Sequence, residues 1–246
     1  MKNILVIGAT SAIAQAFVES MLVDDNRLFL VARDENKLSA IKNNLSIIKD
    51  ANIATDVFDV NVHDDIDDML NSAKSFLEQI DIILIAHGTL PNQENCNSNI
   101  NAAREEFNTN ATSTILLCQK IGNLLEKQQA GTLAVITSVA GDRGRQSNYI
   151  YGAAKGAVNI YLQGLRNRFT KYGVNVLTIK PGFVDTPMTA HLPKNLLFSK
   201  PETIAKGIIR AINKNKSKEI YLPGYWRIIM FIVKSIPGKI FNRLSL

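Results

Sequence analysis

Short runs of Val, Ile and Leu recur along this chain of 246 residues, and helical patterns separate them. These runs predict buried strands near residues 3–7, 27–31, 52–58, 81–86, 131–137, 174–179 and 218–222. Strands that alternate with helices form a parallel sheet, because each strand is reached by a crossover that a helix provides. Hydrophobic residues make up 46% of the chain, enough for one large core. We therefore predict a single-domain α/β fold, a doubly wound parallel sheet of about seven strands with helices on both faces.

The region between the fourth and fifth predicted strands carries two further expectations. Leu90 to Asn99 is the most polar segment of the chain and is expected to form a surface loop. Ile100 to Lys127 has a helical pattern and is expected to form one long helix. The chain contains no internal repeat and no linker rich in Pro, Gly or Ser.

The first predicted strand leads directly into a turn of small residues. Asn3 to Ile7 is followed by Gly8-Ala-Thr-Ser-Ala-Ile-Ala14, and a helical pattern continues to Leu22. A helix that begins after such a turn presents unpaired backbone N–H groups and the positive end of its dipole, which together bind phosphate. The turn is a candidate dinucleotide site. An ordinary strand-to-helix turn is the alternative, since only one glycine is present.

Three side chains in the second half of the chain fit proton transfer. Tyr151 and Lys155 are four residues apart and share one face of a helix, and Ser138 follows the predicted strand at 131–137. A free Tyr titrates at about pH 10. It therefore needs a neighbouring cation such as Lys155 to exchange protons at neutral pH. The Ser138 hydroxyl is placed to hold a substrate oxygen. Taken alone, a Tyr-x-x-x-Lys pair is more often a solvated helix face.

With both features, the chain resembles the short-chain dehydrogenase/reductase family in its single-domain, Rossmann-like form, from Lys2 to about Leu222. In this resemblance Gly8 to Ala14 is the glycine turn, and Pro181-Gly-Phe-Val-Asp-Thr186 is the loop that holds the nicotinamide. Asp59 resembles the family's adenine-side Asp, and Asn110 resembles its helix-bending Asn. The catalytic residues that it implies are Asn110, Ser138, Tyr151 and Lys155. The cofactor-binding residues that it implies are Gly8, Thr10, Ser11, Ala12, Ile13, Asp59, Val60, Ala86, Gly88, Tyr151, Lys155, Pro181, Gly182, Val184 and Thr186.

The resemblance also implies a mechanism for ketone reduction. NADPH would lie across the carboxyl ends of the strands, with its pyrophosphate over the glycine turn and its carboxamide oriented by Thr186. Ser138 and Tyr151 would hydrogen-bond the substrate carbonyl, and Tyr151 would protonate its oxygen. Lys155 would bond the nicotinamide ribose and lower the pKa of Tyr151. Asn110 would hold a water that relays protons to Lys155.

Two departures from the family pattern concern the cofactor site. Ala12 and Ala14 replace the second and third glycines, so methyl groups stand where backbone approaches the pyrophosphate. We expect cofactor binding to be kept but weakened. The family's Asn-Asn-Ala-Gly segment is Ile85-Ala-His-Gly88 here. We interpret His87 as a structural or pocket-wall residue and not as a metal ligand, because the chain has only three His and no ligand cluster.

The end of the second predicted strand bears on the choice between NAD(H) and NADP(H). An acid there would accept hydrogen bonds from a free ribose 2′-hydroxyl, whereas an Arg would pair with a 2′-phosphate. The chain has Ala32 in the acid's place, followed by Arg33. We predict a preference for NADP(H), with Arg33 as its contact, and therefore reduction as the direction. The alternative is that Arg33 caps a surface turn with Asp34 or Glu35.

Positive charge is concentrated at the C-terminal end. From Lys180 onward there are twelve Lys or Arg against three Asp or Glu, and no acid follows Glu219. We predict a dinucleotide-binding catalytic domain at 1–222 and an apolar, basic tail at 223–246. The run from Ile228 to Val233 is shorter than the roughly 20 residues that span a bilayer. The tail fits either a membrane-surface segment on anionic lipid or a subunit interface in a homo-oligomer, a dimer or a tetramer. It matches no nucleic-acid motif.

Two patches bear on the substrate. The segment Asp142-Arg-Gly-Arg-Gln-Ser-Asn148 and the basic tail resemble the branch of the family that contains the decaprenylphosphoryl 2-keto pentose reductase. Arg143 and Arg145 would then receive the phosphodiester of a lipid-linked or phosphorylated keto-sugar, or they would be loop charges paired with Asp142. Another hydrophobic ketone, a 3-oxoacyl chain or a steroid-like molecule, is the alternative substrate. A non-catalytic nucleotide sensor is the alternative function, against which the intact catalytic triplet argues.

Cysteine content and the N-terminal residues bear on the cellular compartment in which the protein works. Only Cys96 and Cys118 occur, so neither a disulfide framework nor a metal site is predicted. Met1-Lys2 runs directly into the first predicted strand, which leaves no room for a cleaved leader. We expect a cytoplasmic protein, at the inner face of the membrane if the tail binds lipid.

Overall fold

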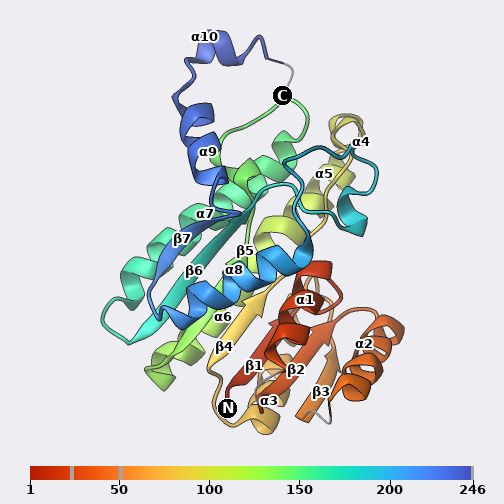
Figure 1. Ribbon diagram of the computed structural model, residues 1–246, viewed down its shortest axis with the longest axis vertical. Coiled ribbons are helices and arrows are strands. Elements are labelled where there is room, and N and C mark those ends of the chain that lie inside the picture. Colours follow the sequence, from red (N-terminus) through yellow and green to blue (C-terminus); the bar gives the residue numbers. More distant parts are fainter. Residues whose placement is uncertain (23–24, 50–51, 245–246) are drawn as a thin grey trace.

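The computed structural model describes residues 1–22, 25–49 and 52–244, so Ser245 and Leu246 of the predicted tail lie outside the described residues. Within these residues, a seven-stranded sheet has the order β3-β2-β1-β4-β5-β6-β7, and all neighbouring strands are parallel (Figure 1). The strands are β1 (Asn3–Ile7), β2 (Arg27–Ala32), β3 (Asn52–Val57), β4 (Ile82–Ile85), β5 (Gly131–Ile136), β6 (Val174–Pro181) and β7 (Lys218–Leu222). The predicted fold class is confirmed.

Helices connect the strands and cover both faces of the sheet (Figure 1). Those that pack on one face are α1 (Ala12–Met21), α2 (Glu35–Ile48) and α8 (Pro201–Asn213). Those on the other face are α3 (Ile66–Leu77), α6 (Ser113–Gln128) and α7 (Tyr149–Phe169). The remaining short helical elements before the tail are η1 (His63–Asp65), α4 (Gln93–Ser98), α5 (Ile100–Phe107), η2 (Asn108–Thr112), η3 (Val139–Asp142) and η4 (Pro187–Thr189).

The central strands are buried on both faces. In β1, Ile4 and Val6 belong to the core under α1, α2 and α8, whereas Leu5 and Ile7 belong to the core under α3, α6 and α7. All four side chains are fully buried. Because successive side chains of a strand point to opposite faces, a strand covered on both sides is apolar at every position. This explains why the strands are visible in the sequence as continuous apolar runs.

The order of the strands reverses beside β1. This strand pairs with β2 on one side and with β4 on the other, and the later strands extend the sheet beyond β4. The connections after β1 and β4 therefore diverge and leave a crevice at the carboxyl ends of the strands. Ligands of open parallel sheets bind in such a crevice.

The expectation of a loop from Leu90 to Asn99 was wrong. Residues 93–98 form α4, and the side chain of Asn92 caps it by accepting a hydrogen bond from the Asn95 N–H at 2.9 Å. Cys96 lies within this helix and is buried. The segment is rich in Asn, which is a preferred N-cap residue, so its polarity marked a helix start and not only a loop.

The long helix expected from Ile100 to Lys127 is divided at Asn110, the residue that the family resemblance marks as helix-bending. The π-helical turn η2 separates α5 from α6. Inside this turn, Asn110 Nδ2 donates to the backbone carbonyl of Glu106 at 3.0 Å. A side chain that bonds the carbonyl four residues earlier competes with the regular backbone bond, and π-turns are frequent at functional sites.

The tail forms α9 (Trp226–Ser235) and α10 (Gly238–Phe241), which extend from the carboxyl edge of the sheet (Figure 1). Trp226 and Met230 are buried together with Val139 in a small separate core. In the part of the chain that the structure describes, no helix is long and apolar enough to cross a membrane.

Candidate active site

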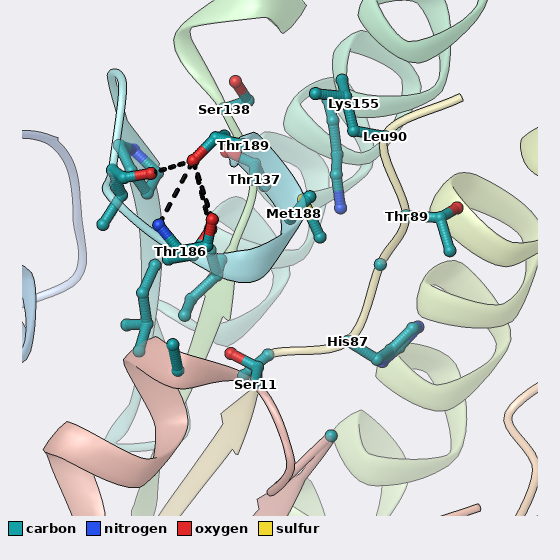
Figure 2. A pocket seen from close by; sticks show the side chains of 18 of the residues that line it. Ser11, His87, Thr89, Leu90, Thr137, Ser138, Lys155, Thr186, Met188 and Thr189 are labelled. Carbon is teal, nitrogen blue, oxygen red and sulfur yellow. Dashed lines mark hydrogen bonds between the residues drawn. The ribbon is translucent and has the colours of Figure 1, made fainter. Parts of the chain in front are cut away.

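A cleft opens at the carboxyl edge of the sheet, where the loops after β1 to β6 meet the start of α7 (Figure 2). It is lined by most of the predicted site residues, namely Gly8, Thr10, Ser11, Ala12, Ile13, Arg33, Val60, Ala86, Gly88, Ser138, Tyr151, Lys155, Pro181, Gly182, Val184 and Thr186. Asp59 and Asn110 do not line it. Thr89, Asn148 and Met188 also line the cleft, and none of them was assigned a role from the sequence. Their position in loops at the carboxyl edge was the available signal.

The turn after β1 has the geometry of an anion site. Gly8 has a φ of +82°, and a Cβ there would lie 2.5 Å from the backbone nitrogen of His87, so only glycine fits. Ser11 caps α1 through its hydroxyl. The N–H groups of Ala12 and Ile13 have no hydrogen-bond partner among the described residues and lie at the positive end of α1. These groups fit a pyrophosphate.

The two alanines of this turn meet different surroundings. Ala14 is fully buried in the core between α1 and the sheet and does not line the cleft, whereas Ala12 does. The expectation that both methyl groups crowd the cofactor was therefore wrong for Ala14. That side chain takes part in packing the helix on the sheet.

Ser138, Tyr151 and Lys155 converge on one wall of the cleft. Ser138 follows β5, and its Oγ accepts a hydrogen bond from the Ala140 N–H at 3.1 Å, which leaves its hydroxyl proton available. A hydrogen bond also joins Tyr151 to Ser138. Lys155 lies one turn after Tyr151 on α7, with its Nζ 5.7 Å from the centre of the Tyr151 ring. Lys155 is only 3% exposed.

Burial dominates the ionisation of both groups on α7. It raises the pKa of Tyr151 to about 12, and the hydrogen bond with Ser138 lowers that pKa only in part. Burial also lowers the pKa of Lys155 to about 8. The lowering of the Tyr151 pKa by the Lys155 cation stays a prediction. Desolvation of the phenolate outweighs the nearby charge, and Tyr151 is protonated at neutral pH.

Asn110 supports the cleft from behind the loop after β4. Its Oδ1 accepts the Thr89 N–H at 3.1 Å, and its Nδ2 donates to Thr89 Oγ1 at 2.9 Å. A Cβ placed on Gly88 would lie 2.9 Å from Asn110 Oδ1 and 3.1 Å from Lys155 Nζ. Asn110 and Lys155 therefore approach each other at Gly88, where a larger residue would separate them. The water relay through Asn110 stays a prediction.

Asp59 stabilises the turn after β3. Its carboxylate accepts the Asn61 N–H at 2.9 Å. Phe58, Val60 and Asn61 line the cleft instead. Direct contact of Asp59 with the adenine side of the cofactor stays a prediction; in this structure its side chain holds the turn that positions Val60.

His87 lies in the wall of the cleft beside the glycine turn (Figure 2). Its Nε2 lies 3.0 Å from Ser113 Oγ and 3.1 Å from Thr114 Oγ1. Burial, and then the charge of Lys155, lower the pKa of His87 to about 3, so the ring is neutral. The described residues contain no group of His, Cys, Asp and Glu that could hold a metal ion. These contacts agree with a pocket-wall residue.

The predicted nicotinamide loop packs on the tail. A Cβ on Gly182 would fall 1.8 Å from Trp226 Cε2, so a glycine is required there. The rings of Phe183 and Trp226 meet edge to face, with centroids 5.6 Å apart. At the end of the loop, the backbone N–H of Thr186 donates to Thr189 Oγ1 at 3.2 Å. The tail thus forms the support for one wall of the cleft.

Arg33 is exposed at the end of β2 and lines the cleft near the glycine turn. The acid that follows it is already engaged, since Asp34 caps α2 by accepting the Lys37 N–H at 3.0 Å and pairs with the Lys37 ammonium at 3.3 Å. Arg33 forms no ion pair with any residue that the structure describes. Its guanidinium is available to a ligand.

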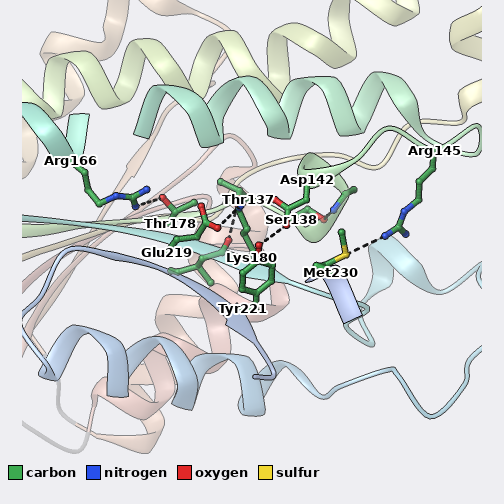
Figure 3. A network of polar contacts seen from close by, with 12 residues as sticks. Thr137, Ser138, Asp142, Arg145, Arg166, Thr178, Lys180, Glu219, Tyr221 and Met230 are labelled. Atoms are coloured by element: carbon green, nitrogen blue, oxygen red, sulfur yellow. Dashed lines mark hydrogen bonds and ion pairs between the residues drawn. The ribbon is translucent and has the colours of Figure 1, made fainter. Parts of the chain in front are cut away.

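A buried ionic network lies beside Ser138 (Figure 3). The Lys180 ammonium pairs with Asp142 at 2.6 Å and with Glu219 at 2.8 Å, and Tyr221 donates to the other oxygen of Asp142 at 2.6 Å. The side chains of Lys180 and Asp142 are each only 4% exposed. Burial and the hydrogen bond to Asp142 raise the pKa of Tyr221. The network joins η3, β6 and β7.

The two arginines of the loop after η3 have different partners. Asp142 pairs with Lys180, and neither arginine forms the alternative ion pair with Asp142 among the described residues. Arg143 donates to the backbone carbonyls of Val233 and Ile236, which places it on the tail and away from the cleft. Its predicted role as a phosphodiester contact was therefore wrong. Arg145 lines the cleft, and its Nη2 lies 3.6 Å from Met230 Sδ (Figure 3).

Comparison with known proteins identifies the family. The family model described as short chain dehydrogenase matches residues 2–196. An uncharacterized oxidoreductase of Streptomyces coelicolor is 30% identical over 247 residues, which cover 99% of this chain and 96% of that protein. Another, from Staphylococcus epidermidis, is 31% identical over 188 residues, which cover 76% of this chain and 80% of that protein. The chain belongs to the short-chain dehydrogenase family. It is an NAD(P)-dependent oxidoreductase.

Solved structures show the same fold. The crystal structure of levodione reductase has a TM-score of 0.83 at 19% identity and covers 92% of this chain and 98% of its own. A variant of actinorhodin polyketide ketoreductase with NADPH has a TM-score of 0.80 at 17% identity and covers 91% of this chain and 97% of its own.

Burial of Lys155 predicts a stability cost that can be measured. Because its pKa is lowered from 10.5 to about 8, the folded protein binds this proton less well than the unfolded chain. The cost is complete below pH 8, falls as the pH rises toward 10.5, and is absent above. We expect Lys155→Met to raise the free energy of unfolding at pH 7 by on the order of 3 kcal/mol, a gain that disappears above about pH 10.5.

Urea unfolding of the protein without cofactor measures this effect, and Lys171→Met, at an exposed position, is the matched control. A loss of stability in Lys155→Met at pH 7 would contradict the prediction.

Proposed function

We propose that this oxidoreductase reduces a ketone to an alcohol and prefers NADP(H) over NAD(H). The proposal rests on the convergence of Ser138, Tyr151 and Lys155 beside the loop from Pro181 to Thr186. A protein that only sensed a nucleotide would not need this triplet. Two structural neighbours, levodione reductase and a polyketide ketoreductase, are reductases by name.

Each residue of the triplet has a task in the reduction. The nicotinamide, when bound, supplies a hydride to the carbonyl carbon. The Ser138 hydroxyl donates a hydrogen bond to the carbonyl oxygen. Tyr151, which burial keeps protonated, gives its proton to that oxygen as negative charge develops there. The Lys155 ammonium binds ribose hydroxyls and stabilises the phenolate that remains.

The preference for NADP(H) rests on Arg33. Ala32 leaves no carboxylate at the end of β2 to accept the ribose 2′-hydroxyl or to repel a 2′-phosphate. Arg33 is exposed at the edge of the cleft and has no ion pair within the described residues. A 2′-phosphate would give it a charge-assisted, two-point contact.

Arg145 supports a substrate that carries an anionic group. It lines the cleft on the same loop region as Ser138, and its Nε is buried without a hydrogen-bond partner in the described residues. A buried guanidinium nitrogen without a partner is unfavourable, and a phosphate oxygen would satisfy it. We therefore propose a lipid-linked or otherwise phosphorylated keto-sugar. A 3-oxoacyl chain or a steroid-like ketone is the second candidate, favoured by the apolar wall of Phe183, Met188 and Leu192.

The proposed setting follows from the substrate. We propose that the enzyme works in the cytoplasm as a homo-oligomer, a dimer or a tetramer, and that a lipid-linked substrate draws it to the inner face of the membrane. No role in binding nucleic acid is proposed, because the cations of the tail are interleaved with Ile, Phe and Trp.

Replacement of the proton donor tests the catalytic assignment. We expect Tyr151→Phe to lower turnover by a factor of roughly 10² to 10⁴, since the ring stays and only the acidic hydroxyl is lost. NADPH binding should not change. NADPH consumption with a panel of ketones and a fluorescence titration of the cofactor measure the two effects. Tyr149→Phe, at an exposed neighbour on α7, is the control. Near-normal turnover in Tyr151→Phe would refute the assignment.

Replacement of Arg33 tests the cofactor preference. We expect Arg33→Ala to weaken NADPH binding by about 1.5 to 3 kcal/mol, which is the range for a hydrogen bond to a charged group. NADH, which lacks the 2′-phosphate, should bind as before. Fluorescence titration of both cofactors measures the ratio, with Lys206→Ala on α8 as the control for lost positive charge. An unchanged ratio means that Arg33 does not select the cofactor.

Replacement of Arg145 tests the substrate class. We expect Arg145→Gln to raise the KM for phosphorylated ketones by roughly 10- to 100-fold, because a charge-assisted contact is lost. The KM for neutral ketones should stay the same. Steady-state kinetics on matched pairs of phosphorylated and neutral keto-sugars make the comparison. If the wild-type enzyme does not distinguish the members of a pair, the substrate is one of the neutral hydrophobic ketones.

A further inference from the structure

The tail lies at the same edge of the sheet as the cleft (Figure 1). Trp226 at the start of α9 packs on Gly182 and Phe183, and Met230 one turn later contacts Arg145. All three of these contacted residues line the cleft. A surface that contacts the exposed side of α9 would therefore lie next to the proposed substrate site.

One face of α9 is already occupied. Trp226 is 2% exposed and Met230 is fully buried, and Ile229 and Val233 pack beside them. These positions are three or four residues apart, so they form one stripe along the helix. Arg143 holds the far end of the helix by donating to the carbonyl of Ile236 at 2.8 Å.

The Arg143 guanidinium also holds α10. It lies 3.7 Å from the centre of the Phe241 ring, and Phe241 is buried. Both helices of the tail are thus fastened to the loop after η3.

The opposite face of α9 is apolar and exposed. Ile228 is 66% exposed, Phe231 70% and Ile232 57%, and they share one side of the helix. Ile240 on α10 is also exposed. We call Ile228, Phe231 and Ile232 the outer apolar face. A short amphipathic helix usually exposes polar residues on the side away from the core, so an apolar outer face needs a partner.

Positive charge borders this face. Arg227 and Lys234 lie two turns apart on one flank of α9, and Lys239 and Arg243 lie on and after α10. All four are exposed, and none forms an ion pair within the described part of the chain. No Asp or Glu occurs after Glu219. The border is therefore uniformly cationic.

We propose that the outer apolar face and its four cations dock the protein on an anionic lipid bilayer. The apolar side chains enter the boundary between head groups and acyl chains, and the cations lie at the level of the phosphates. The cleft then opens beside the membrane surface. This inference concerns a surface and holds whether or not the reductase assignment is correct.

Charge and area favour a bilayer over a second copy of the chain. A two-fold pairing of this surface would bring eight cations together without an acid to offset them, because the same patch meets itself. The face also presents only three large apolar side chains, whereas a stable protein interface buries about 800 Å² on each partner. Anionic head groups supply the missing negative charge.

Co-sedimentation of the full-length protein with vesicles tests the proposal. Phosphatidylcholine vesicles with and without phosphatidylglycerol serve as the probes. We expect the protein to sediment with the anionic vesicles and to be released as salt rises, because screening weakens the attraction. Changing Ile228, Phe231 and Ile232 together to Ser should weaken binding roughly tenfold or more. Changing exposed Ile100 and Ile160 to Ser is the matched control and should have no effect.

A second pair of variants distinguishes an effect of the tail cations from an effect of the net charge of the protein. Arg227, Lys234, Lys239 and Arg243 are changed to Gln in one variant, and the exposed lysines Lys171, Lys206, Lys214 and Lys216 are changed to Gln in the other. Only the first should lose binding to anionic vesicles. Equal loss in both variants would show that net charge and not this surface is responsible, and would overturn the proposal.

The fluorescence emission of Trp226 reports whether the tail is folded in every variant. Trp226 is the only Trp of the chain and is buried, so unchanged emission shows that α9 remains packed. Truncation of the tail would be a poorer test, because it also removes Trp226 and Met230 from their core. If the intact protein stays in the supernatant with anionic vesicles, the proposal is wrong. If the Ser variant of α9 instead dissociates an oligomer in size-exclusion chromatography, the surface is a subunit interface.

Discussion

The parallel pairing of β1 with β4 is the constraint on which the rest of the site depends. It brings two strands that are far apart in the sequence into contact, and their following loops diverge. The glycine turn after β1 then faces the loop of His87 and Gly88 after β4, so closely that a Cβ on Gly8 would collide with the backbone. Because all seven strands of the described sheet are parallel, the residues that follow them meet at one edge. A cofactor cleft is a direct consequence of this pairing.

Buried charge links this cleft to the tail. Lys180 is held between Asp142 and Glu219, and these ion pairs offset the cost of removing the three groups from water. Asp142 belongs to the same short segment as Ser138 and Arg143, and Arg143 binds both helices of the tail. Ser138, the end of β6 and the tail are therefore parts of one connected structure.

Local patterns in the sequence were sufficient for the strands, the glycine turn and the pairing of Tyr151 with Lys155. Each of these depends on residues that are close in the chain, through strand burial, helix capping or helical spacing. The family resemblance marked a helix bend at Asn110, but the hydrogen bonds of Asn110 with Thr89 in a separate loop were not visible, because they are not local in the sequence. The dominant effect on the pKa of Tyr151 was missed for a similar reason. Spacing along a helix shows a neighbouring charge, whereas desolvation depends on everything packed around the phenol.

The sequence by itself determined the α/β class, the carboxyl edge of the sheet as the place of the cleft, and the three side chains, Ser138, Tyr151 and Lys155, that come together there. Only the tertiary structure decided which partner each charged residue contacts. Arg143 and Arg145 are two residues apart in the chain and suggested one anion site, with Asp142 as the alternative partner. In the structure Asp142 pairs with Lys180, Arg143 binds the tail and Arg145 lines the cleft. Likewise, Trp226 and Phe231 look equivalent in the sequence, but one is buried against Gly182 and the other is exposed. The physical reason is that apolar runs and helical spacing are local, whereas charge pairing and burial depend on which distant elements pack together.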